Sequence, residues 1–157
     1  MGNLIFILTA VVILAADQAT KAWFSAVLAP GETLWHWGFL SITLATNTGA
    51  AFSLFQNAFL PLVIIRSIGV ILIISIVILY NRRLQTWGGN WLMAALGLIL
   101  AGALGNLTDQ IRQHYVVDFI YTDFWPTFNI ADSAVVVAAF ILVFLFILPR
   151  KEKSSEH

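Results

Sequence analysis

The sequence has no cysteine, and this absence excludes several kinds of site. The chain has no disulfide, no thiolate metal ligand and no cysteine nucleophile. Histidine is also scarce: His36, His114 and His157 lie far apart and show none of the spacings of metal ligands. We therefore expect a site that uses neither a metal ion nor another cofactor.

Charge is scarce as well. Charged residues make up 10% of the chain, against about 25% in an ordinary soluble domain, and 60% of the residues are hydrophobic. The formal net charge is zero and no basic run is present. These features predict an integral membrane protein and argue against a nucleic-acid partner. The length of 157 residues predicts one membrane domain over residues 1–157.

Four apolar stretches are long enough to cross a hydrocarbon core of about 30 Å. The predicted spans cover approximately residues 4–28, 59–80, 91–107 and 132–148. The first has Ala15 and Ala16 near a possible signal-peptide cleavage point, but no cation precedes the apolar run, which favours a retained span. Residues 34–44 have β-type content with interfacial tryptophans. The predicted fold is an all-α membrane protein with four transmembrane helices and a small extracytoplasmic β-rich region between the first two.

The basic residues are distributed unevenly around these spans. Five of them belong to the 81–90 loop and the C-terminal tail: Arg82, Arg83, Arg150, Lys151 and Lys153. Lys21 and Arg112 lie near the opposite side. The positive-inside rule therefore predicts cytoplasmic termini. Six of the eight acidic residues then belong to the outer side: Asp17, Glu32, Asp109, Asp118, Asp123 and Asp132. We expect the chemistry near the outer face of the membrane.

Residues 116–133 contain three aspartates, Asp118, Asp123 and Asp132, and no lysine, arginine or histidine. Carboxylates crowded together without cationic partners repel one another and share protons, which is the electrostatic condition for two-carboxylate acid–base chemistry. Asn129 and Asp132 also have the spacing of a capping box at the start of the last span. That structural role does not exclude catalysis.

Other polar residues lie inside the predicted spans. Asp17 and Lys21 are one turn apart on the first span, and Asn106 and Asp109 share a face of the third. Arg66 lies within the second span and needs an acceptor, for which the aspartates are the obvious supply. These charged residues also have structural alternatives. Asp17 can simply pair with Lys21, and the side chains of Lys21 and Arg66 can extend to the membrane interface.

Five short motifs occur in order along the chain. They are Asp17-Gln-Ala-Thr-Lys21, Asn47-Thr-Gly-Ala-Ala-Phe52, Gly105-Asn-Leu-Thr-Asp109, Val117-Asp-Phe-Ile120 and Phe128-Asn-Ile-Ala-Asp132-Ser133. Together they resemble the bacterial lipoprotein signal peptidases, also called signal peptidase II, over nearly the whole chain. Each motif alone is weak, whereas five in the same order are specific.

The resemblance implies a four-helix aspartyl protease of the bacterial inner membrane. Such an enzyme removes signal peptides from diacylglyceryl-modified prolipoproteins, cleaving before the lipidated cysteine, in contact with membrane lipid and without a metal. We expect it to function as a monomer. The implied catalytic pair is Asp118 and Asp132. The implied substrate-binding or site-supporting residues are Asp17, Lys21, Asn47, Gly49, Asn106, Asp109 and Asn129. One departure is Gln110, which stands where the family usually has arginine.

Three other functions fit part of the pattern. Ser25 and Lys21, four apart on one helical face, would suit a serine–lysine peptidase. Acids within the membrane would suit a proton-coupled transporter, although transporter sites usually lie near the bilayer midplane. A purely structural membrane subunit is the third alternative, and it would tolerate Asp118→Asn.

Overall fold

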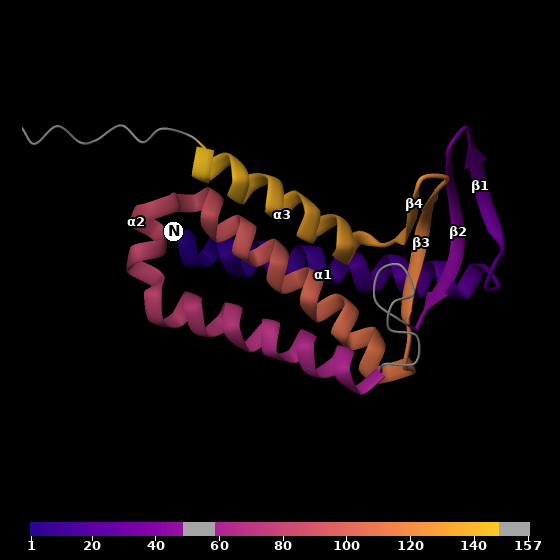
Figure 1. The fold of residues 1–157 in the computed structure, drawn as a ribbon, viewed down its shortest axis with the longest axis horizontal. Helices are drawn as coiled ribbons and strands as arrows, with labels where there is room; N and C mark the ends of the chain where they lie inside the picture. Colours follow the sequence, from indigo (N-terminus) through magenta and orange to yellow (C-terminus); the bar gives the residue numbers. More distant parts are fainter. Residues whose placement is uncertain (49–58, 148–157) are drawn as a thin grey trace, which may run out of the picture.

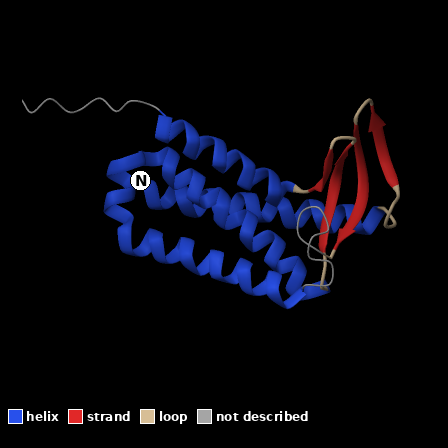
Figure 2. Cartoon of the chain, viewed as in Figure 1, coloured by secondary structure: helices blue, strands red, loops and turns tan. Residues whose placement is uncertain are grey.

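The computed structural model describes residues 1–48 and 59–147 as three helices and one four-stranded sheet. The elements in chain order are α1 (Gly2–Val27), β1 (Thr33–Trp37), β2 (Leu40–Asn47), α2 (Phe59–Gln113), β3 (Val116–Thr122), β4 (Trp125–Phe128) and α3 (Ile130–Ile147). The helices lie side by side and the sheet stands across one end of them (Figures 1 and 2). The predicted combination of membrane helices with a small sheet is confirmed.

The helices carry their large apolar side chains on the outside. Ile78 and Phe140 are each 72% exposed, whereas Ala95 and Ala101 are completely buried. In water this arrangement would be unfavourable, but lipid solvates the outer side chains and small residues let helices approach closely. All three helices are long and apolar enough to cross a membrane. The described helices therefore have the pattern of a protein embedded in lipid.

Helix α2 is longer than a single span requires. Its 55 residues correspond to about 80 Å of helix, more than twice the thickness of a hydrocarbon core. Gly89 interrupts it with φ 58° and ψ −144°, a conformation that glycine adopts readily. α2 runs away from the sheet, turns back and returns toward it (Figure 1).

The prediction of four separate helices is thus not confirmed, because the described residues form three. The predicted loop at 81–90 is wrong, since the helical assignment continues through it and only Gly89 departs from helical geometry. The third predicted span also ends later than 107, at Gln113. The residues of 81–86 are all compatible with a helix, so a single glycine is enough to make the turn.

The sheet is antiparallel, with strand order β1-β2-β3-β4. β1 and β2 confirm the strands predicted between the first two helices. β3 and β4 come from the segment between α2 and α3, where no strands are predicted from the sequence. The pairing of β2 with β3 sets Ala45 opposite Asp118 and Asn47 opposite Val116. This register brings the end of β2 beside the acidic segment.

Candidate active site

Asp118 lies on β3 and is only 2% exposed. The side-chain amide of Asn47 donates to its Oδ2 at 3.0 Å, and that of Asn129 donates to its Oδ1 at 2.6 Å. Burial, followed by the negative charge of Asp132, raises the pKa of Asp118 to about 7, although both hydrogen bonds and the charge of Lys21 oppose the rise. A carboxyl group with this pKa exchanges its proton near neutral pH, as an acid–base catalyst must.

Asp132 lies in the first turn of α3, where it forms a reciprocal cap with Asn129. The backbone N–H of Asp132 donates to Asn129 Oδ1 at 3.0 Å, and the backbone N–H of Asn129 donates to Asp132 Oδ2 at 3.3 Å. The predicted capping box is confirmed in these contacts. The remaining oxygen, Oδ1, accepts from the side-chain amide of Asn106 at 2.8 Å. Asp132 therefore helps to begin α3 and faces the polar residues of α2 at the same time.

Two asparagines connect the carboxylates of Asp118 and Asp132. Asn129, which is completely buried, donates both to Asp118 and to Asn106 Oδ1, the latter at 3.1 Å. Asn106 in turn donates to Asp132, and its Oδ1 also accepts from Lys21 Nζ at 3.0 Å. The polar path between the two acids therefore runs through neutral amides, which orient the carboxylates without cancelling their charge.

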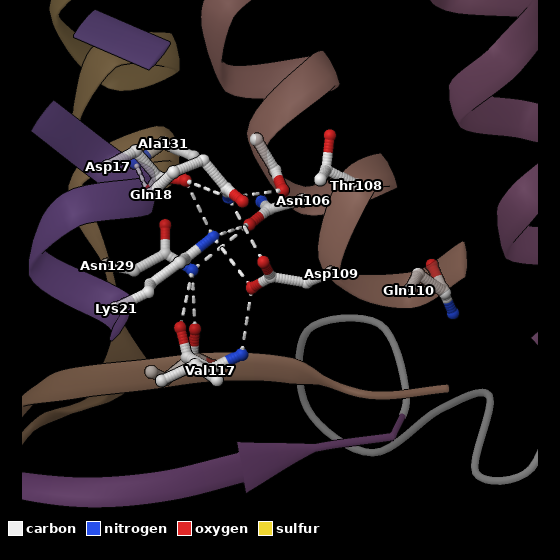
Figure 3. Close-up of polar contacts among 12 residues, drawn as sticks. Asp17, Gln18, Lys21, Asn106, Thr108, Asp109, Gln110, Val117, Asn129 and Ala131 are labelled. Carbon is white, nitrogen blue, oxygen red and sulfur yellow. Dashed lines mark hydrogen bonds and ion pairs between the residues drawn. The ribbon is translucent and has the colours of Figure 1, made fainter. Parts of the chain in front are cut away.

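Lys21 is the centre of a second group of acids. Its Nζ lies 2.8 Å from Asp17 Oδ2 and 3.0 Å from Asp109 Oδ2, and all three side chains are nearly or fully buried. Asp17 also accepts from the backbone N–H of Ala131 at 2.9 Å, and Asp109 accepts from that of Val117 at 3.2 Å. These contacts, many of which Figure 3 shows, fasten α1 and α2 to the start of α3 and to β3.

Gln18 is a member of this group that the sequence analysis did not single out. Its Nε2 donates to Asp109 Oδ1 at 3.0 Å, to Asp17 Oδ2 at 3.1 Å and to the backbone oxygen of Gly105 at 3.2 Å. A Cβ at Gly105 would lie 2.5 Å from Asp17 Oδ2, so α2 needs glycine there to approach α1. The signal for Gln18 was its polarity inside an apolar span, next to Asp17.

Arg66 finds a different partner from the one expected. It donates to the side-chain oxygen of Gln110 rather than to a carboxylate. Both residues belong to α2, but they lie on the two arms that Gly89 separates. Gln110 is 1% exposed, so this buried polar contact joins the two arms.

The structure brings together every predicted site residue that it describes. Those residues are Asp17, Lys21, Asn47, Asn106, Asp109, Asp118, Asn129 and Asp132. Gly49 lies outside the described residues. Asp123, the third aspartate of residues 116–133, is exposed after the end of β3. Of the three aspartates in residues 116–133, Asp118 and Asp132 therefore take part in the hydrogen bonds of the site.

The serine–lysine alternative is not supported by the contacts of Lys21. Ser25 and Lys21 line the same small cavity, but no hydrogen bond joins them in the described part of the chain. The Nζ of Lys21 is instead engaged by ion pairs with Asp17 and Asp109 and by a hydrogen bond to the side-chain oxygen of Asn106. Among residues 1–48 and 59–147, no three histidine, aspartate or glutamate side chains are arranged to hold a metal ion.

Comparisons with known proteins agree with this geometry. The family described as Signal peptidase (SPase) II matches residues 9–148. The lipoprotein signal peptidase of Dehalococcoides mccartyi strain 195 is 40% identical over 147 residues, covering 92% of this chain and 90% of that protein. That of Moorella thermoacetica is 39% identical over 152 residues, covering 96% and 98%.

A solved structure of a bacterial membrane enzyme, determined by the in meso method, has the same fold. It superposes with a TM-score of 0.79 at 29% identity, covering 94% of each chain. A second such enzyme structure gives a TM-score of 0.77 at 31% identity, covering 92% of this chain and 94% of that one. The chain therefore belongs to the signal peptidase II family, the lipoprotein signal peptidases, whose role is to remove signal peptides from prolipoproteins.

Proposed function

We propose that Asp118 and Asp132 are the catalytic pair of an aspartic endopeptidase that acts on diacylglyceryl-modified prolipoproteins and cleaves before the lipidated cysteine. The observation that carries the proposal is the environment of Asp118. It is buried, it is held by two amide donors, and both its burial and the charge of Asp132 raise its pKa to about 7. Asp118 therefore exchanges its proton near neutral pH, close to the charge of Asp132.

One ionised and one protonated carboxyl group can supply the general base and the general acid that peptide hydrolysis needs. The ionised carboxylate accepts a proton from water as the water oxygen attacks the scissile carbonyl carbon. The protonated carboxyl donates to the carbonyl oxygen, and a proton then passes to the leaving nitrogen as the carbon–nitrogen bond breaks. We assign these roles to the pair and not to its individual members.

Asn47, Asn106 and Asn129 are proposed to orient the two acids, and Asn47, which is partly exposed, to contact the substrate backbone as well. An amide has both a donor and an acceptor, which suits a peptide bond as a ligand. Asp17, Lys21 and Asp109 are proposed as supporting residues, because their contacts fasten the elements that carry the pair. The substrate's acyl chains would remain in lipid while its scissile bond reaches the sheet end of the helices.

The proposed topology has four spans in one domain: α1, the two arms of α2, and α3. The turn of α2 lies at the opposite end of the helices from the sheet (Figure 1). Arg82 and Arg83 precede this turn, so the positive-inside rule supports cytoplasmic termini and an acidic site near the outer face of the inner membrane. All the described site residues come from one chain, which supports a functional monomer.

The test is cleavage by the purified protein in detergent. A prolipoprotein carrying diacylglyceryl on its lipobox cysteine is compared with the same precursor without the lipid. The proposal predicts cleavage of the lipidated precursor and little or no cleavage of the other, with Asp118→Asn as the inactive control. Equal cleavage of both precursors would remove the lipid requirement, and full activity of the Asp118→Asn protein would remove the catalytic assignment.

A further inference from the structure

The sheet has two edges, and one of them ends at the proposed catalytic pair. The strand order β1-β2-β3-β4 leaves β1 and β4 each paired on one side only within the described sheet. β4 ends at Phe128, and the next residue, Asn129, donates from its side chain to Asp118 at 2.6 Å and from its backbone N–H to Asp132 at 3.3 Å. The edge of β4 therefore continues into the site, whereas β2 lies between β1 and the strand that carries Asp118.

β4 is also more accessible than the strand with which it pairs. None of its four residues is buried, whereas most residues of β3 are. Pro126 fits this position, because proline has no N–H to donate and is found in edge strands of a sheet. The exposed N–H and C=O groups of an edge strand are a template for pairing with another extended chain. The free edge of β4 is therefore a candidate binding surface.

The register of β3 shows which backbone groups of β4 face outward. The backbone N–H of Val117 donates to Asp109 and its carbonyl accepts from the side chain of Asn129, each at 3.2 Å, so Val117 faces away from β2. Backbone groups alternate in direction along a strand, so Ile120, three residues further on, faces toward β2. Ile120 lies opposite Phe128. The N–H and the carbonyl of Phe128 therefore face away from β3, at the free edge.

The orientation of the sheet determines which part of a substrate follows this edge. The helices are long and apolar enough to cross a membrane, and the sheet stands across one end of them (Figures 1 and 2). A signal peptide that spans the membrane runs beside the helices. The segment after the cleavage point leaves the site on the sheet side, where β4 extends from Asn129 toward the turn between β3 and β4 (Figure 1).

We propose that the free edge of β4 binds the residues that follow the lipidated cysteine, which add to the sheet as a further strand through main-chain hydrogen bonds to Phe128. This inference rests on the proposed function, because it concerns the substrate of that reaction. Strand addition obtains its affinity from main-chain groups that every residue except proline has in full. The same edge can therefore accept precursors whose sequences differ after the cysteine.

The first test changes the substrate and leaves the enzyme unmodified. Synthetic lipidated precursors carry a single N-methyl group at successive amides after the cysteine, and kcat/KM is measured for each. At the amide that donates to Phe128 we expect a fall of about tenfold, near the upper end of the net value of one hydrogen bond. The amides on either side of it should tolerate the methyl group, because neighbouring amides of a strand point in opposite directions. Equal effects at all these amides, no effect at any of them, or effects only before the cysteine would overturn the inference.

The second test changes the enzyme. Phe128→Pro and Phe128→Ala both remove the ring, but only proline also removes the N–H. Each variant is assayed with the full precursor and with one that ends at the lipidated cysteine. We expect kcat/KM of Phe128→Pro to lie about tenfold below that of Phe128→Ala with the full precursor, and the two to be equal with the short one.

Two outcomes of the second test need to be distinguished from each other. An equal difference between the variants with both precursors would mean that the N–H of Phe128 serves the fold or the reaction alone, and the inference would be wrong. If Phe128→Pro does not fold, the N-methyl series decides, because it uses the unmodified enzyme. Failure of the proposed function itself is separate, since it would appear as an active Asp118→Asn protein.

Discussion

Two groups of buried acids lie next to each other in this protein, and they have different electrostatic environments. Asp17 and Asp109 share the ammonium group of Lys21 and accept backbone N–H groups from α3 and β3. Asp118 and Asp132 are connected through the amides of asparagines. The first group contains a cation in direct contact with both of its acids and joins elements, whereas the acids of the second group are in contact with neutral amides among the described residues. The same residue type thus serves the fold in one group and, we propose, the reaction in the other.

The largest expected effect comes from neutralising either acid of the proposed pair. Asp118→Asn and Asp132→Asn should each lower kcat by about 10²–10⁴-fold or more, because asparagine cannot exchange the proton. The two acids act as one unit, so the double variant should be scarcely worse than either single variant. Turnover of the lipidated precursor per folded molecule measures this. Near-normal turnover by Asp132→Asn would make Asp132 a cap only.

Removing the cation from the group of Asp17, Lys21 and Asp109 should lower the stability of the folded protein. Lys21→Met leaves Asp17 and Asp109 buried without their cation, and breaking a buried ion pair in this way costs about 3–5 kcal/mol. We expect poor yield of folded protein and a large drop in melting temperature in detergent. Met is a suitable replacement because it preserves most of the apolar stem. A Lys21→Met protein that melts normally would mean that the two groups do not differ as described.

The raised pKa of Asp118 should make the folded protein less stable as the pH rises. Its pKa is about 7 in the folded protein and about 3.9 in an unfolded chain, so the folded state binds this proton more tightly. The contribution to stability is therefore fully present below about pH 4 and is lost as the pH rises through about 7. Comparing melting temperatures of the unmodified protein and Asp118→Asn across that range isolates the effect. A difference that stays constant with pH would contradict the raised pKa.

The same pKa predicts the shape of the activity profile. If the reaction needs one proton on the pair, kcat/KM should decline on the alkaline side as that proton is lost, with the limb beginning near pH 7. The decline should follow the pair and not the group around Lys21. A flat profile from pH 6 to pH 9 would argue against a shared proton.

The smallest expected effect is that of removing metal ions. The proposed reaction uses only carboxylates and amides, so a chelator should leave turnover of the lipidated precursor unchanged. Clustered carboxylates bind hard cations, which makes this a meaningful test. Activity that disappears with a chelator and returns with added zinc would replace the proposed mechanism.

Local patterns in the sequence were enough to predict several parts of this structure. The pair Asp17 and Lys21 and the cap formed by Asn129 and Asp132 depend on helical spacing, and both are confirmed by the contacts. The β-type composition of residues 34–44 predicted the region in which β1 and β2 form. The ion pair and the cap each depend on residues within about one helical turn of each other, so the sequence alone is enough to predict them.

Features that depend on distant pairing could not be predicted in the same way. β3 pairs with β2 and β4 pairs with β3, and the placement of Asn47 beside Asp118 depends on the register of β2 with β3. Gln110 receives Arg66 only because α2 turns at Gly89 and brings its two arms together. The motifs indicated which residues belong to the site, and the tertiary structure supplies the partner that each one has.

The most direct test of the difference between the two groups is a crossed measurement on Asp118→Asn and Asp109→Asn. Each protein is assayed for its melting temperature in detergent and for cleavage of the lipidated precursor per folded molecule. We predict that Asp118→Asn melts near or above the unmodified protein and has lost cleavage. Asp109→Asn should melt at a clearly lower temperature and retain cleavage well above that of Asp118→Asn. The account is contradicted if Asp109→Asn folds normally and is inactive while Asp118→Asn still cleaves.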